Sequence, residues 1–218
     1  MATFTQLKNY VGRLIGESDG SGTDSTRDDL INDAIKEIAT RYPFSCNKKS
    51  TTLTLSSNVA TMPTDIDYSH LGEIAVYNYS ATTSGSTKYT YTPVPFDDVI
   101  SYSTGSYVYT IDQENSQIKS NQSDGSITMD YFAVPADLSG TDSTKFPIPM
   151  AIAYQAAGQY WQSIEEDPDQ ARINFQRADE AIQKAITRDK IGKPPRGLKS
   201  VYDDNEFLST DSILACER

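Results

Sequence analysis

The stretch AIAYQAAGQYWQSIEEDPDQARINFQRADEAIQKAI, residues 151–186, predicts two packed helices and decides the fold. Its apolar side chains recur at helical spacing on both sides of Asp167-Pro168, where Asp167 can cap a helix and Pro168 fits a first helical position. The connection at 165–168 is short, so we expect an antiparallel hairpin. The residues expected to face the core are Ala153, Ala156, Ala157, Tyr160, Trp161 and Ile164 in the first helix, and Ala171, Phe175, Ala178, Ile182, Ala185 and Ile186 in the second.

Two further helices are predicted near the N-terminus. Apolar residues from Phe4 to Ile15 recur at helical spacing, and Gly16 is expected to stop that helix. The next helix has Ser25 as its predicted N-cap, with Asp28 completing a capping box. Pro43 is expected to end it.

The intervening segment, 45–144, is rich in Thr, Ser and Tyr and predicts a β structure. Alternating residues at 51–55 and 59–62 flank a turn-like Ser56–Asn58 and indicate a hairpin. Further strands are expected at 73–79, 88–92, 107–111 and 126–132, one or two helical turns at 96–102, and a mobile loop at 80–87.

These elements together predict an α+β fold. We expect an antiparallel bundle of two N-terminal and two C-terminal helices, residues 1–44 and 145–190, as the helical body. Residues 45–144 would form an inserted antiparallel β-sandwich or barrel lobe, because short strands separated by turns favour that architecture. Residues 191–218 would form an extended C-terminal docking arm.

The composition excludes several classes of protein. The 218 residues contain no apolar run long enough to cross a bilayer, and the N-terminus lacks the pattern of a secretory signal. The two cysteines, Cys46 and Cys216, are expected to be free thiols in a reducing cytoplasm. A formal net charge of −11 disfavours tight binding of nucleic acid, and it suits a soluble protein past which DNA slides without sticking.

No group of residues matches a catalytic or metal-binding pattern, so we expect neither an enzyme nor a cofactor. The single histidine, His70, follows Asp65 and Asp67 in a D-x-D-x-x-H pattern that we interpret as a polar turn, not as a metal site. The glycines between the first two helices lack the Lys-Ser or Lys-Thr pair of a phosphate loop. The acidic loops do not match an EF-hand, although weak cation binding stays open.

Two surface features allow more than one interpretation. The tyrosine-rich strands could present a glycan- or receptor-binding face around Tyr89, Tyr91 and Tyr109, but Tyr and Thr are also what half-buried strands prefer. The basic stretch 184–199 could touch phosphate or dock on acidic surfaces of partner copies, and the acidic balance elsewhere favours docking.

The last 28 residues, 191–218, contain two adjacent prolines and scattered apolar side chains. Burying each large side chain yields about 1.5–3 kcal/mol, whereas ordering each residue costs about 1–2 kcal/mol. We therefore expect this arm to be mobile in the monomer and to order against another chain.

The order of these pieces resembles the head-to-tail adaptor, or connector, proteins of tailed bacteriophages. The resemblance covers roughly residues 3–190 and consists of the element order and short sequence similarities. The similar stretches are RYPF at 41–44, TTLTLSSNVATMP at 51–63, TDI at 64–66, GEIAV at 72–76, YTPV at 91–94, FDD at 96–98 and MDYFAVP at 129–135.

The resemblance implies a virion structural protein that forms a ring, usually of twelve copies, in the neck between head and tail. Its partners would be the portal protein, a tail, tail-tube or nozzle protein and further copies of itself, with DNA passing through the channel without sequence-specific binding and without a membrane. By location alone, the portal-docking residues would be Lys193, Arg196, Lys199, Val201, Tyr202, Phe207, Leu208, Ile213 and Leu214. The alternatives are a neck stopper or tail-completion protein, and a glycan- or receptor-binding β module on a helical support.

Overall fold

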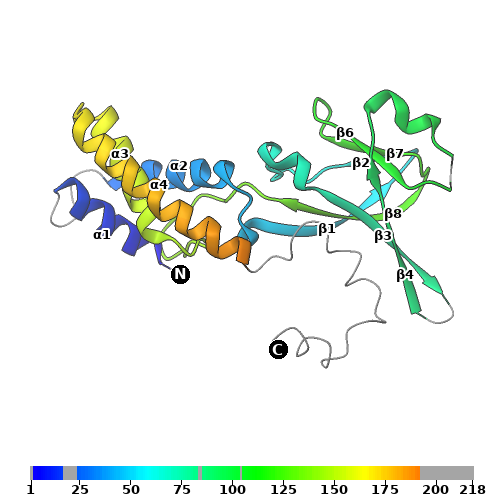
Figure 1. Cartoon of the computed structure of the whole chain (residues 1–218), viewed down its shortest axis with the longest axis horizontal. Helices are drawn as coiled ribbons and strands as arrows, with labels where there is room; N and C mark the ends of the chain where they lie inside the picture. Colours follow the sequence, from blue (N-terminus) through cyan, green and yellow to red (C-terminus); the bar gives the residue numbers. More distant parts are fainter. Residues whose placement is uncertain (1, 17–23, 83–84, 104, 192–218) are drawn as a thin grey trace, which may run out of the picture.

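The computed structural model describes residues 2–16, 24–82, 85–103 and 105–191. Helices occupy one end of the molecule and β-strands the other, so the chain has the predicted mixed α and β content (Figure 1). The four α-helices are α1 (Phe4–Ile15), α2 (Asp24–Arg41), α3 (Pro149–Ser163) and α4 (Pro168–Ile191).

The N-terminal helices begin and end close to where the sequence predicts. The Thr3 side chain accepts a hydrogen bond from the Gln6 backbone amide, the Gln6 side-chain oxygen accepts one from the Thr3 amide, and Gly16 ends α1 at φ 83°. Ser25 is not the cap of α2 as predicted, because the helix already begins at Asp24 and places Ser25 in its first turn. A capping side chain has to lie outside the helix, which Ser25 does not.

Helix α3 lies at the centre of the helical end. It packs against α1, α2 and α4, and most of its residues from Ala151 to Tyr160 are buried. The predicted α3–α4 hairpin is confirmed, and the Asp167 carboxylate caps α4 by accepting hydrogen bonds from the amides of Asp169 and Gln170 at 3.0 Å each. Ile164 was expected to face the core but is 44% exposed, because α3 ends at Ser163.

The close approach of α3 and α4 depends on Gly158. A Cβ atom at this position would lie 2.6 Å from two ring carbons of Phe175 on α4. Phe175 itself is only half-buried, since its ring lies over Gly158 and reaches the surface. The predicted inward orientation of Phe175 is therefore only partly correct.

The strands form two separate four-stranded sheets. One sheet has the order β1-β8-β3-β4 and is antiparallel throughout, and the other has the order β2-β7-β6-β5 with only the short β5 parallel to its neighbour. The strands are β1 (Lys48–Leu55), β2 (Val59–Thr61), β3 (Ala75–Thr82), β4 (Gly85–Thr90), β5 (Thr92–Pro93), β6 (Val108–Asp112), β7 (Gln117–Ser120) and β8 (Gly125–Phe132).

The hairpin predicted at 51–62 is wrong in its pairing. The turn forms, with Ser57 and Asn58 at φ 52° and 72° and a single bridge between Ser56 and Val59. Beyond that bridge the strands separate, because β1 pairs with β8 in one sheet and β2 with β7 in the other. The turn therefore carries the chain from one sheet to the next.

Two other elements differ from the sequence predictions, and a third agrees with them. Strand β7 was missed. The expected mobile loop at 80–87 is largely strand, because β3 and β4 pair from Tyr77–Thr90 out to Thr82–Gly85. The helical turns predicted at 96–102 are confirmed as the 3₁₀ helix η3 (Phe96–Ser101).

Two hydrophobic clusters hold these elements together. The first joins α1, α2, α3 and α4 with Phe44 and Phe146, and the second is built from side chains of both sheets, including Ile118 and Met129. None of the helices in the described ranges combines the length and the apolar character that a bilayer crossing requires.

The Gly158–Phe175 contact yields a stability prediction. Gly158→Ala should lower the free energy of unfolding by about 1 kcal/mol or more, because overpacking outweighs the better helix propensity of alanine. Chemical denaturation measures the change, and Gly72→Ala, where an added Cβ meets nothing within 4 Å, is the control. In a Phe175→Ala background the Gly158→Ala change should become neutral or stabilising; a loss that persists there would refute the contact.

The turn between β6 and β7 should respond to acid. Asp112 accepts hydrogen bonds from the Asn115 side chain at 3.0 Å and amide at 3.2 Å and pairs with Lys119 at 3.0 Å, which together lower the pKa of Asp112 to about 2. Because the folded pKa is depressed, this stabilisation is present above about pH 4 and is lost as the pH falls through about 2. Hydrogen exchange of the β6–β7 amides should show wild type and Asp112→Asn converging over that range; a constant difference would contradict the prediction.

Candidate subunit-contact surfaces

The D-x-D-x-x-H residues do not converge on a common point. Asp65 pairs with Lys49 and accepts a hydrogen bond from the Tyr131 hydroxyl at 2.9 Å, and Asp67 caps the amide of Ser69 at 2.9 Å. Burial and the Asp65 carboxylate raise the pKa of Tyr131 to about 12. Among the described residues, no three His, Cys, Asp or Glu side chains are grouped to hold a metal ion.

His70 instead connects the two ends of the molecule. Its Nε2–H donates to the Ala39 carbonyl oxygen at 2.8 Å, and its ring meets the edge of Phe132 on β8. The Ala39 carbonyl lies in the last turn of α2, where carbonyls lack partners within the helix. The predicted polar turn thus ties the sheets to α2.

Cys46 lies at the same joint and does not have the environment of a reactive thiol. It is half-buried, and burial raises the pKa of the Cys46 thiol, so the thiolate is disfavoured at neutral pH. Cys216 lies outside the described residues.

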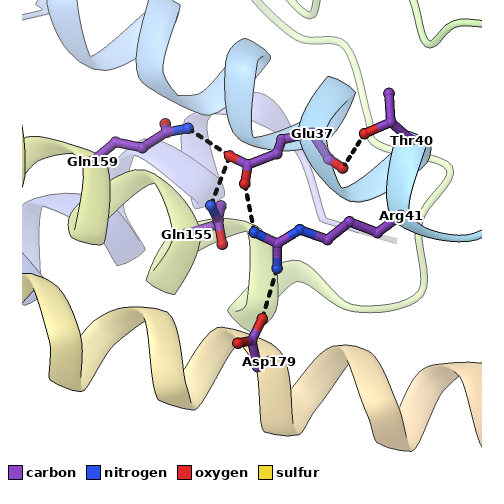
Figure 2. A network of polar contacts seen from close by, with 6 residues as sticks. All are labelled: Glu37, Thr40, Arg41, Gln155, Gln159 and Asp179. Carbon is purple, nitrogen blue, oxygen red and sulfur yellow. Dashed lines mark hydrogen bonds and ion pairs between the residues drawn. The ribbon is translucent and has the colours of Figure 1, made fainter.

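A polar network fixes three helices against one another. The Glu37 carboxylate on α2 accepts hydrogen bonds from the side-chain amides of Gln155 at 2.7 Å and Gln159 at 3.0 Å, both on α3 (Figure 2). The same carboxylate pairs with Arg41, which reaches Asp179 on α4 at 2.6 Å. Gln155 is 1% exposed, so the network begins inside the body and ends at its surface.

The sequence contains a weak signal of this network that the prediction missed. Gln155 and Gln159 stand four residues apart among alanines on the helix expected to be the most buried. Buried amides need partners, and a carboxylate on a neighbouring helix satisfies two at once. Spacing alone does not show which helix supplies that carboxylate.

The end of α4 is anchored at the joint between helices and sheets. Asp189 accepts hydrogen bonds from the hydroxyl and the amide of Ser45, and the Lys190 ammonium lies 5.8 Å from the ring centroid of Tyr42. Tyr42 meets Phe44 edge-on, and Phe44 meets Phe146 in the same way. The segment that follows α4 therefore starts from a defined point.

The predicted portal-docking residues follow this point but cannot be placed. Lys193, Arg196, Lys199, Val201, Tyr202, Phe207, Leu208, Ile213 and Leu214 all lie outside the described residues. Of the predicted basic stretch, Lys184, Arg188 and Lys190 are described, and all three are exposed on α4.

An open groove runs along the outer side of α4. Pro168, Ala171 and Phe175 form its apolar lining, and its charged lining is mixed, with Arg172, Asp179, Glu180 and Lys184. The sequence did not reveal this groove, because Phe175 reads as an ordinary core residue at helical spacing. The glycine opposite, Gly158 on α3, leaves the space that the ring occupies.

The far end of the β region carries a second apolar surface. In η3, Val99 is buried while Ile100 is 82% and Phe96 48% exposed, with the Lys119 ammonium 4.0 Å from the Phe96 ring centroid. Exposed apolar groups of this kind are typical of contact surfaces.

The tyrosines considered for ligand binding do not form an exposed face. Tyr91 and Tyr109 are buried in the second hydrophobic cluster, and burial raises the pKa of both phenols. The Tyr109 hydroxyl donates to the Ile74 carbonyl at 3.3 Å, and Tyr89 stacks against Tyr107. Tyr91 and Tyr109 thus act as core residues of the β region.

The comparison with known protein families gives a match. The family model described as SU10 adaptor protein matches residues 2–197. No curated protein matches the chain.

The Glu37 network predicts a loss of stability when its charge is removed. Glu37→Gln should lower the free energy of unfolding by about 1–3 kcal/mol, because a neutral amide cannot accept from Gln155, Gln159 and Arg41 together. Thermal denaturation measures the change, and Glu180→Gln on the exposed side of α4 is the matched control. Equal stability of the two variants would show that the network does not hold the helices.

Proposed function

The chain belongs to the SU10 adaptor protein family, and from that membership we propose that it forms a ring between the portal and the tail of a phage particle. The family is one of structural phage adaptor proteins, which places this chain among virion-associated proteins that contact other head and tail proteins. The ring, its twelve copies and its place in the neck are the proposal.

The observation that carries the proposal is the fixed end of α4. A helical body held by the Glu37 network delivers residue 191 to one defined point, where Asp189 and Ser45 lock the last turn. In a ring, that geometry would start every arm 191–218 at the same height and spacing. Repeated weak arms on a repeated portal site bind strongly together.

The two ends of the molecule suit two different neighbours. The helical body, 1–44 and 145–190, would form the ring wall, and the inserted β-sandwich lobe, 45–144, would reach the tail or nozzle protein. The exposed apolar side chains of η3 lie on that lobe, away from the end of α4 (Figure 1). An acidic chain would let DNA pass without sticking to the channel.

A neck stopper or tail-completion protein is the second candidate function. It would use the same apolar lobe surface but would not bind the portal. The glycan-binding alternative is disfavoured, because Tyr91 and Tyr109 are buried.

The proposal predicts that a chain ending at Ile191 loses the portal. Both hydrophobic clusters lie before residue 192, so the shortened chain should stay folded by circular dichroism. Its capture by purified portal should fall about tenfold or more, because each ring loses all of its arms.

Ile100→Ser is the control, because it changes the far lobe and leaves α4 intact. It should retain portal capture. If the shortened chain binds portal as well as the full chain does, the arm is not the docking element. If the full chain binds only tail components, the stopper function takes its place.

A further inference from the structure

We propose that the outer face of α4 docks on the outer face of α2 of a second copy, which would make α4 and α2 the two sides of a head-to-tail contact. The proposal rests on the proposed ring and names the surfaces that would form it. Neither face takes part in the portal-docking role of residues 191–218.

The outer face of α4 carries a pair of exposed cations, and an apolar groove, also lined by the acids Asp179 and Glu180, lies beside them. Pro168, Ala171 and Phe175 form the floor of the groove. Lys184 lies at one end of the groove, and Arg188, one turn later, lies outside it; both side chains are exposed. In the described part of the chain, neither has an acid within ion-pair distance. Like charges four residues apart repel each other on a helix, so opposite charges on a second copy would relieve that repulsion.

The α2 face carries the opposite pair. Asp29 and Asp33 are exposed and also stand four residues apart. Neighbouring acids of α2 are engaged, since Asp28 pairs with Lys8 at 2.6 Å and Glu37 belongs to the network. Asp29 and Asp33 have no base within ion-pair distance among the residues that the structure describes. Leu30, between them, is only partly buried and offers an apolar contact.

The two pairs match each other in sign and spacing. Four residues of helix span about 6 Å, so helices lying side by side can bring both pairs together. Helices α2 and α4 of one copy both pack against α3, and none of the ion pairs among the described residues joins Asp29 or Asp33 to Lys184 or Arg188, so the contact has to form between copies. Two different faces meeting make a heterologous contact, the kind that closes into a ring when the rotation permits.

Charge reversal on each side tests the contact. The α4 variant is Lys184→Glu with Arg188→Glu, and the α2 variant is Asp29→Lys with Asp33→Lys. Arg13→Glu with Lys145→Glu is the control, because it makes the same change in charge as the α4 variant at exposed residues of neither face. Each is compared with wild type by sedimentation velocity over a range of concentration and salt, with circular dichroism confirming the fold.

Wild type and control should self-associate, and less so at high salt. Each reversed variant should associate about tenfold more weakly or worse, because like charges then face each other. Mixing the two reversed variants should restore association, since every contact in an alternating assembly again pairs acid with base. No one-sided steric or folding defect would produce that recovery.

Three results would overturn the contact. They are a wild type that stays monomeric at every concentration and salt, reversed variants that associate like wild type, and a mixture that fails to recover. A variant with reversed α4 charges that associates like wild type but loses portal capture would assign this face to the portal instead. The adaptor role is judged separately by portal capture of the full chain, so either proposal can fail without the other.

Discussion

The packing of α3 against three other helices is the constraint on which the rest of the structure depends. A helix packed against three others needs small residues where backbones approach, and Gly158 lets the Phe175 ring lie directly over α3. It also needs partners for its polar side chains, and Glu37 supplies them to Gln155 and Gln159. Packing and hydrogen bonding thus fix α2, α3 and α4 in a single arrangement.

The same helices also hold the segments that lead into the sheets. The last turn of α2 holds His70 through the Ala39 carbonyl, and the last turn of α4 holds Ser45 through Asp189. Both ties use groups at the C-terminal ends of helices, where free carbonyls and side chains are available. An adaptor has to keep its neighbours in register, and a joint made from helix ends orients the lobe and the start of the C-terminal segment together.

The sequence predictions failed where a local pattern had two tertiary solutions. Residues 51–62 form the expected turn, yet their strands enter different sheets. Strand β1 pairs along its whole length with β8, and β2 pairs with β7. The pattern of the tyrosine-rich strands fits both exposed and buried tyrosine side chains, and in the structure Tyr91 and Tyr109 are buried. Ile164 fits the apolar stripe of α3 by spacing, but the helix ends one residue earlier.

The sequence by itself determined the elements whose signals are local: four helices from apolar spacing, their ends from Gly16 and Asp167-Pro168, and most strands from alternation. It also determined the acidic balance and, through element order, the resemblance to phage adaptors. Only the tertiary structure decided the sheet pairing, the Glu37 network, the anchoring of α4 and the groove beside Phe175. These depend on contacts between residues far apart in the chain, and periodicity records which face of a helix is apolar but not which neighbour covers it.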